Sequence, residues 1–113
     1  MILIIRKKAT KEELQKMAED FGGDYIKVVV DIEGNILAGG GARHVDGEQV
    51  LLQDGSKQEH LWGGGLDLEG GEIDYNSMIN IRPQQQNLSR DIMSQEVRYA
   101  FDTIVKKLLL SEV

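Results

Sequence analysis

The chain has 113 residues, 41% of them apolar and 28% charged, which is the composition of a soluble globular protein and the length of one domain. It has no cysteine, which excludes disulfide bonds, thiolate metal sites and a cysteine nucleophile. The apolar run at the N-terminus, Met1 to Ile5, is far shorter than the roughly 20 residues of a membrane span, and basic residues follow it, the reverse of a secretory signal. We therefore expect a single cytoplasmic domain over residues 1–113, with no membrane partner.

The first predicted elements are a strand and a helix. Residues 2–6 are mostly apolar and β-branched, which indicates a short buried strand. Thr10 stands three residues before Glu13, the spacing of a capping box that opens a helix. Gly22-Gly23 is a typical helix end. The sequence predicts a helix over about residues 11–21, with one apolar face made of Leu14, Met17, Ala18 and Phe21.

Turn signals dominate the next part of the chain. Residues 25–32 are strongly β-forming, and the tight-turn sequence Glu-Gly-Asn at 33–35 predicts a hairpin with the strand that follows. The pairs Asp46-Gly47 and Asp54-Gly55 also suit hairpin turns, so the segment EQVLLQ between them is interpreted as a strand. A short helix is the alternative there, because Glu, Gln and Leu also favour helix.

The second half contains two further hairpin or strand segments. Apolar and polar residues alternate on both sides of Gly70-Gly71 within residues 66–75, which predicts a hairpin, and the glycines at 63–65 are interpreted as a hinge between strands. Residues 77–83 are predicted to be a strand that stops at Pro83, and residues 84–91 a polar loop.

The last predicted element is a helix over about residues 94–110. Ser94 can cap it, Lys106 and Lys107 suit its C-terminal end, and a continuous apolar stripe runs along it. The order of elements has no alternating series of strands and helices. We therefore expect an α+β fold, a mainly antiparallel sheet with the two helices, about 11–21 and 94–110, packed on one face.

The net charge of −6 is concentrated in the middle of the chain. Residues 31–76 hold ten Asp and Glu but only Arg43 and Lys57 as basic residues. This segment would repel a phosphate backbone, so we expect no nucleic-acid partner. A cationic partner or a divalent metal fits the negative charge of this segment, but ordinary solvated turns are the favoured explanation.

The segment RHVDGE contains the first candidate site. In a strand, His44, Asp46 and Glu48 would project from one face, where an imidazole and two carboxylates can bind a divalent metal. Gly47 interrupts that geometry and favours a turn instead. We therefore expect neither a metal nor another cofactor.

The segment DGSKQEHLW contains the second candidate. Ser56 would act as a nucleophile only beside a base, and the two histidines, His44 and His60, are the available ones. A binding role is the stronger of the two site interpretations, because an aromatic surface with a few polar groups is typical of ligand pockets. The alternative to any site is a partly exposed strand with Trp62 in the core. The predicted pocket wall is Trp62 together with Asp54, Ser56, Lys57, Gln58 and Glu59.

The segment INIRPQQQNLSR contains the third candidate. Arg82 and Arg90, beside several amides and Ser89, can bind a carboxylate or a phosphate. The alternative is a solvated loop in which Arg82 pairs with the acidic segment.

Three stretches resemble a small prokaryotic domain family with no assigned function: ATKEELQKMAEDFGGDYIKVVVDIEGNILAGG, DGSKQEHLWG and SMINIRPQQQNLSR. The resemblance covers nearly the whole chain and includes His44, Trp62-Gly63 and the stretch from Asn80 to Pro83. An acidic residue is commoner in the family where His60 stands, and the residues after Trp-Gly are less rich in glycine. The resemblance implies a shared surface and supplies no chemistry.

Two functional hypotheses follow. The first is a non-enzymatic binding or interaction domain with a small-molecule or protein partner, and with a possible homodimer. The alternative is a small metal-dependent or hydrolytic enzyme whose cleft is lined by His44, Asp54, Glu59 and Arg82. Whether the His44, Gln58 and Arg82 segments converge in space separates the two.

Overall fold

The computed structural model describes residues 1–110 and contains one five-stranded antiparallel sheet, in the order β1-β3-β2-β4-β5. The strands are β1 (Leu3–Ile5), β2 (Tyr25–Asp31), β3 (Ile36–Gly39), β4 (Leu61–Asp67) and β5 (Ile73–Asp74). The helices are α1 (Lys11–Ala18), α2 (His44–Gln53) and α3 (Gln95–Leu109). The α+β prediction is confirmed.

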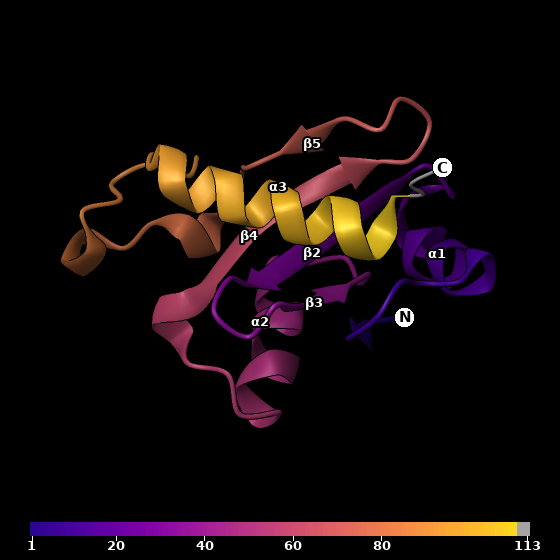
Figure 1. Cartoon of the computed structure of the whole chain (residues 1–113), viewed down its shortest axis with the longest axis horizontal. Helices are drawn as coiled ribbons and strands as arrows, with labels where there is room; N and C mark the ends of the chain where they lie inside the picture. The colour runs from indigo at the N-terminus through magenta and orange to yellow at the C-terminus, as the bar shows by residue number, and fades with distance from the viewer. Residues whose placement is uncertain (111–113) are drawn as a thin grey trace.

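Two of the helices cover the same face of the sheet, as predicted. Met17 and Ala18 of α1 and Phe101 of α3 pack in one core with Val28 and Val30 of the central strand. Figure 1 shows α3 lying across the sheet, with α1 at the end where both chain termini lie. The capping box of Thr10 and Glu13 opens α1, Ser94 caps α3, and the 3-10 turn η1 (Glu19–Phe21) extends α1 to the predicted end. Both local helix signals are therefore correct.

The third helix, α2, covers the opposite face and corrects the strand interpretation of EQVLLQ. Leu51 of α2 packs with Val29, Ala38 and Leu61 in a second, smaller core. Gly47 is helical here and makes no turn, and a Cβ at this position would lie 3.2 Å from Val29 Cγ2. Helix propensity and the burial of Leu51 therefore outweigh the first Asp-Gly signal, whereas Gly55 does turn the chain, at φ +110°, after the helix.

The two predicted hairpins are present. The β2–β3 pair runs from Val28 opposite Gly39 to Asp31 opposite Ile36, and Asn35 in the turn adopts φ +59°. The β4–β5 pair includes Leu66 opposite Ile73. The glycines at 63–65 form no hinge, because they lie inside β4 and pair with residues 27–29 of β2.

The segment after β5 is also different from its prediction. Residues 77–83 form no strand; the chain makes two 3-10 turns there, η3 (Met78–Asn80) and η4 (Pro83–Gln85), and the isolated bridges Asn76–Asp91 and Arg82–Asn87 hold residues 76–91 together. In Figure 1 this segment extends beyond the N-terminal end of α3. The side chain of Asn80 takes the place of a neighbouring strand along β4.

Candidate functional site

Asn80 and Asn87 determine the shape of the segment between residues 76 and 93. Both side chains are buried, at 0% and 3% exposure. The Asn80 amide accepts the N–H of Gly63 at 2.8 Å and donates to the carbonyl of the same residue at 2.9 Å, so it pairs with β4 as a neighbouring strand would. The Asn87 amide accepts the N–H of Met93 and donates to the carbonyls of Asn80, Ser89 and Asp91. The polar loop of the sequence prediction is thus organised around two buried amides.

Arg82 is the centre of a group that we call the Arg82 network, in which Arg82 and Trp62 are buried, Gln85 is half-buried, and Gln58 and Glu59 are exposed. The guanidinium lies 4.2 Å from the centre of the Trp62 ring and donates to the carbonyls of Leu61 and Gln58, the latter at 2.6 Å. It also donates to Gln85 Oε1 at 3.1 Å, and the Gln85 amide donates to the Glu59 carbonyl at 3.0 Å. The structure therefore brings Trp62 and Arg82 together with the backbone carbonyls of Gln58 and Glu59, and the pocket wall itself stays a prediction.

The Arg82 network is closed to solvent at its centre, where Arg82 Nε and Trp62 Nε1 are buried without a hydrogen-bond partner among residues 1–110. Arg82 is 4% exposed and Trp62 is 4% exposed. Burial lowers the pKa of Arg82, and the neighbouring carboxylate of Glu48 opposes that effect. Glu48 itself is buried, and the Gln58 amide donates to it at 3.4 Å. The guanidinium binds backbone carbonyls and fixes the start of β4.

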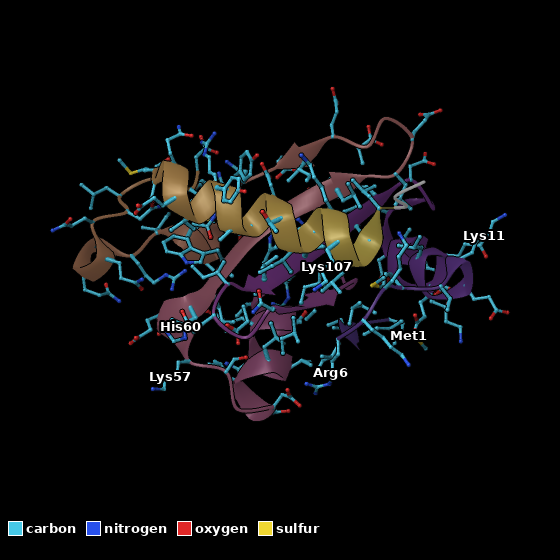
Figure 2. All side chains as sticks on the ribbon, viewed as in Figure 1. Met1, Arg6, Lys11, Lys57, His60 and Lys107 are labelled. Carbon is cyan, nitrogen blue, oxygen red and sulfur yellow. The ribbon has the colours of Figure 1, made fainter. Side chains whose placement is uncertain are left out.

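The remaining residues of the DGSKQEHLW candidate lie in other contacts. Ser56 Oγ donates to Asp31 Oδ2 at 2.6 Å, so its hydroxyl bonds to a turn carboxylate and to no histidine. Asp54 accepts from Arg6 at 2.7 Å, at the C-terminal end of α2. The Lys57 side chain is exposed, and Figure 2 shows it on the same side of the molecule as His60.

His44 lies at the opposite end of α2 from Asp54. A ten-residue helix is about 15 Å long, so the two side chains cannot share one catalytic contact. The cleft predicted for an enzyme from His44, Asp54, Glu59 and Arg82 therefore does not form. Within residues 1–110, no group of three or more His, Asp and Glu residues can hold a metal ion.

The three residues of the metal hypothesis separate because α2 is a helix. His44 and Glu48 lie four residues apart on related sides of α2, while Asp46 points elsewhere. Asp46 pairs with Arg43 at 3.1 Å on the surface, and Glu48 is buried. The side chains of His44, Asp46 and Glu48 therefore do not share one face, as they would in a strand.

His44 opens onto a cleft of about 310 Å³, which we call the α2 cleft. Its polar lining consists of Lys27, Arg43, His44, Arg90, Asn76 and Ser77. Its apolar lining includes Val45, Met78 and Ile79. Arg90 comes from the third sequence candidate, so the cleft joins parts of the first and third candidates and excludes the second.

The His44 ring is held in one orientation. Its Nε2–H donates to the carbonyl of Gly64 in β4 at 2.7 Å. Burial lowers the pKa of His44, and the charge of Lys27 adds to that effect, while the bond to Gly64 and the charge of Asp74 oppose it. The neutral imidazole is therefore favoured, with Nε2 as the protonated atom.

The glycines that follow Trp62 are required for these close approaches. A Cβ on Gly63 would lie 2.6 Å from the Ser77 Cβ, one on Gly64 would overlap the Asp74 carbonyl, and one on Gly65 would overlap the Tyr25 hydroxyl. Because residues 63–65 have no side chains, β4 packs closely against β5 and against Ser77, which lines the α2 cleft. Sequence reasoning missed Lys27 and Ser77 as cleft residues, because nothing in their local pattern distinguishes them.

These features define a small α+β domain with a sheet covered by helices on both faces and a cleft beside the start of α2. Residues 3–108 match the model of a family described as a protein of unknown function, DUF5674, and the chain belongs to that family. The resemblance to a domain family without an assigned function is confirmed. No curated protein and no solved structure matches the chain. In the part of the chain that the structure describes, every helix is too short or too polar to cross a bilayer.

Proposed function

We propose that this protein is a binding domain and that its ligand occupies the α2 cleft. The observation that carries this proposal is the convergence of Lys27, Arg43, His44 and Arg90 around one hollow of about 310 Å³. These side chains come from β2, the start of α2 and the segment after η4. A volume of this order is typical of small-molecule sites.

Binding fits the bonding of the candidate catalytic groups better than turnover does. A general base must lie within hydrogen-bond reach of the proton that it removes. His44 Nε2 donates to a backbone carbonyl, and the Ser56 hydroxyl donates to Asp31. The Ser56 hydroxyl and the His44 ring therefore do not form a nucleophile–base pair.

A fragment screen by NMR tests this function. Small soluble fragments of positive, negative and neutral charge are added one at a time, and amide chemical shifts are recorded. We expect binding fragments of at least one charge class to shift the amides of His44, Val45, Ser77 and Ile79. Shifts confined to Gln58–Trp62 would place the ligand at the exposed side chains of Lys57 and Glu59 instead, and would overturn the proposal.

A further inference from the structure

We infer, on the basis of the proposed function, that the ligand of the α2 cleft is a small organic anion, with a carboxylate or phosphate group attached to an apolar part. The inference deepens the binding role by naming the chemistry that the cleft can recognise. It depends on the charges, the free donors and the apolar wall of the cleft.

The charge of the cleft is opposite to the charge of the chain. Asp and Glu outnumber Lys and Arg by 19 to 13, yet neither Asp nor Glu lines the α2 cleft among the described residues. Lys27, Arg43 and Arg90 all line it. In a protein that repels anions overall, a cleft with this lining selects an anionic ligand by local charge.

The guanidinium groups are available to a ligand. Arg43 donates two hydrogen bonds to the Asp46 carboxylate, at 3.1 and 3.3 Å, but the two side chains are 72% and 42% exposed, and exposed ion pairs stabilise a fold by less than about 1 kcal/mol. The backbone of Arg90 is fixed, because its carbonyl accepts from Ser77 N and from the Asn80 amide. Its exposed side chain therefore extends from a fixed point of the backbone and lines the cleft.

Two further kinds of hydrogen-bond donor belong to residues that line the hollow. Ser77 Oγ accepts the N–H of Ile79 at 3.2 Å, so its own O–H stays available as a donor. The α2 helix begins at His44 after Arg43, whose side chain does not cap it. The N–H of Asp46 bonds to the Arg43 carbonyl at 3.2 Å. His44 and Val45 carry the remaining N–H groups of the first turn, which have no acceptor within the helix. These hydrogen-bond donors add to the positive charge of Lys27, Arg43 and Arg90. They favour a ligand with a negatively charged oxygen over a halide ion.

The other wall of the cleft is apolar and exposed. Met78 is 64% exposed and Val45 is 41% exposed, and both line the hollow with Ile79. An inorganic anion would leave this wall in water. A ligand with an apolar part beside its charged group would cover it, which adds about 25 cal/mol for each square ångström of apolar surface removed from water.

Calorimetric titration with three probes tests the inference at low ionic strength. The probes are phenyl phosphate, inorganic phosphate and benzyl alcohol. We expect phenyl phosphate to bind most tightly, inorganic phosphate more weakly, and benzyl alcohol weakest, because only the first engages both walls. The affinity for phenyl phosphate should fall as salt is added.

The double variant Arg43→Gln/Arg90→Gln locates the binding. Both side chains are exposed, so the variant should fold, and the loss of two charge-assisted contacts should weaken phenyl phosphate binding by about tenfold or more. The matched control is Lys7→Gln/Lys57→Gln, which removes the same charge outside the α2 cleft. Lys7 lines a second basic hollow beside β1, and Figure 2 shows Lys57 near the start of β4. The control should bind like the wild type.

The outcomes separate the two proposals. Equal loss of affinity in both double variants would overturn the inferred site, and so would unchanged binding in Arg43→Gln/Arg90→Gln. If neutral or cationic fragments bind the cleft and phenyl phosphate does not, the anionic ligand is wrong and the binding function stands. If neither the fragments nor the probes bind there, both are wrong.

Discussion

Single buried side chains position the cleft in this protein. Asn80 replaces a strand along β4 by bonding both polar backbone groups of Gly63, and the same amide donates to the carbonyls of Tyr75 and Arg90. It thereby connects β4 to the backbone of Arg90, whose side chain lines the α2 cleft. A substitution at Asn80 should therefore affect stability and the cleft together.

The variant Asn80→Ala tests this role. It leaves buried backbone groups without partners, and we expect it to reduce the free energy of unfolding by about 2–4 kcal/mol. Urea unfolding measures the change. Asn76→Ala is the control, because that exposed amide makes a single bond to Asp91 and its loss should cost well under 1 kcal/mol, roughly the value of a surface contact. Equal effects of the two variants would contradict the assigned role.

His44 predicts a dependence of stability on pH. Burial lowers the pKa of His44 below its ordinary value of 6.5, with Lys27 acting in the same direction and the bond to Gly64 and the charge of Asp74 in the opposite one. The unfolded chain therefore takes up the proton first as the pH falls. This contribution is fully present above about pH 6.5 and is lost as the pH falls through the lower folded pKa.

The variant His44→Gln isolates that contribution. Glutamine keeps an N–H donor for the Gly64 carbonyl and has no proton to gain in this range. Between about pH 7.5 and pH 5 we expect the wild type to lose more unfolding free energy than the variant, as measured by urea unfolding at each pH. An identical loss in both proteins would show that His44 does not cause it.

At the scale of elements, β4 depends on the absence of side chains at residues 63–65. A Cβ at Gly64 would overlap the Asp74 carbonyl and lie 2.6 Å from Phe101 Cζ, and neither group can move without disturbing β5 or α3. The glycine run that suggests a hinge in the sequence is instead a place of close packing.

The pair Gly64→Ala and Gly70→Ala tests this interpretation. We expect Gly64→Ala to lower the unfolding free energy by about 3 kcal/mol or more, through overpacking. Gly70→Ala should be nearly neutral, because its Cβ would make only an ordinary contact, 3.5 Å from Asp67 Oδ2. Thermal unfolding of the two variants gives the comparison, and similar melting temperatures would refute the packing role.

The elements differ in how far their sequences predict them. α1, α3 and the β2–β3 hairpin carry local signals, namely caps, apolar periodicity and turn residues, and the structure follows them. α2 has an Asp-Gly pair inside it and another at its end, which imitate hairpin turns. The run Val28-Val29-Val30 is a better indication that α2 is a helix. All three side chains are buried, and a strand that is buried on both faces needs an element packed against each face of its sheet.

At the scale of the whole molecule, the candidate site could be predicted only in parts. His44 and Arg90 were recognised separately, but their meeting depends on the fold of residues 76–90, which long-range bonds of Asn80 and Asn87 determine. Arg82 and Trp62 were predicted to contact a ligand, and they are buried in a network with the backbone. Residue type indicates reactive groups, whereas burial decides which of them a ligand can reach.

The homodimer expected from the sequence stays a prediction. Met78, Leu88, Met93 and Tyr99 are each more than half exposed, and such side chains are common where a partner binds. Sedimentation velocity at micromolar concentration should give about twice the chain mass of 12.6 kDa. A species of 12.6 kDa alone would contradict it.

A crystal structure of the protein grown with phenyl phosphate tests the central claim most directly. We predict that the phosphate group lies in the α2 cleft in contact with Arg43, Arg90 and Ser77, with the ring against Met78 and Val45. An empty α2 cleft, with phenyl phosphate bound beside Lys57 and Glu59 or in the basic hollow of Lys7, would contradict the account.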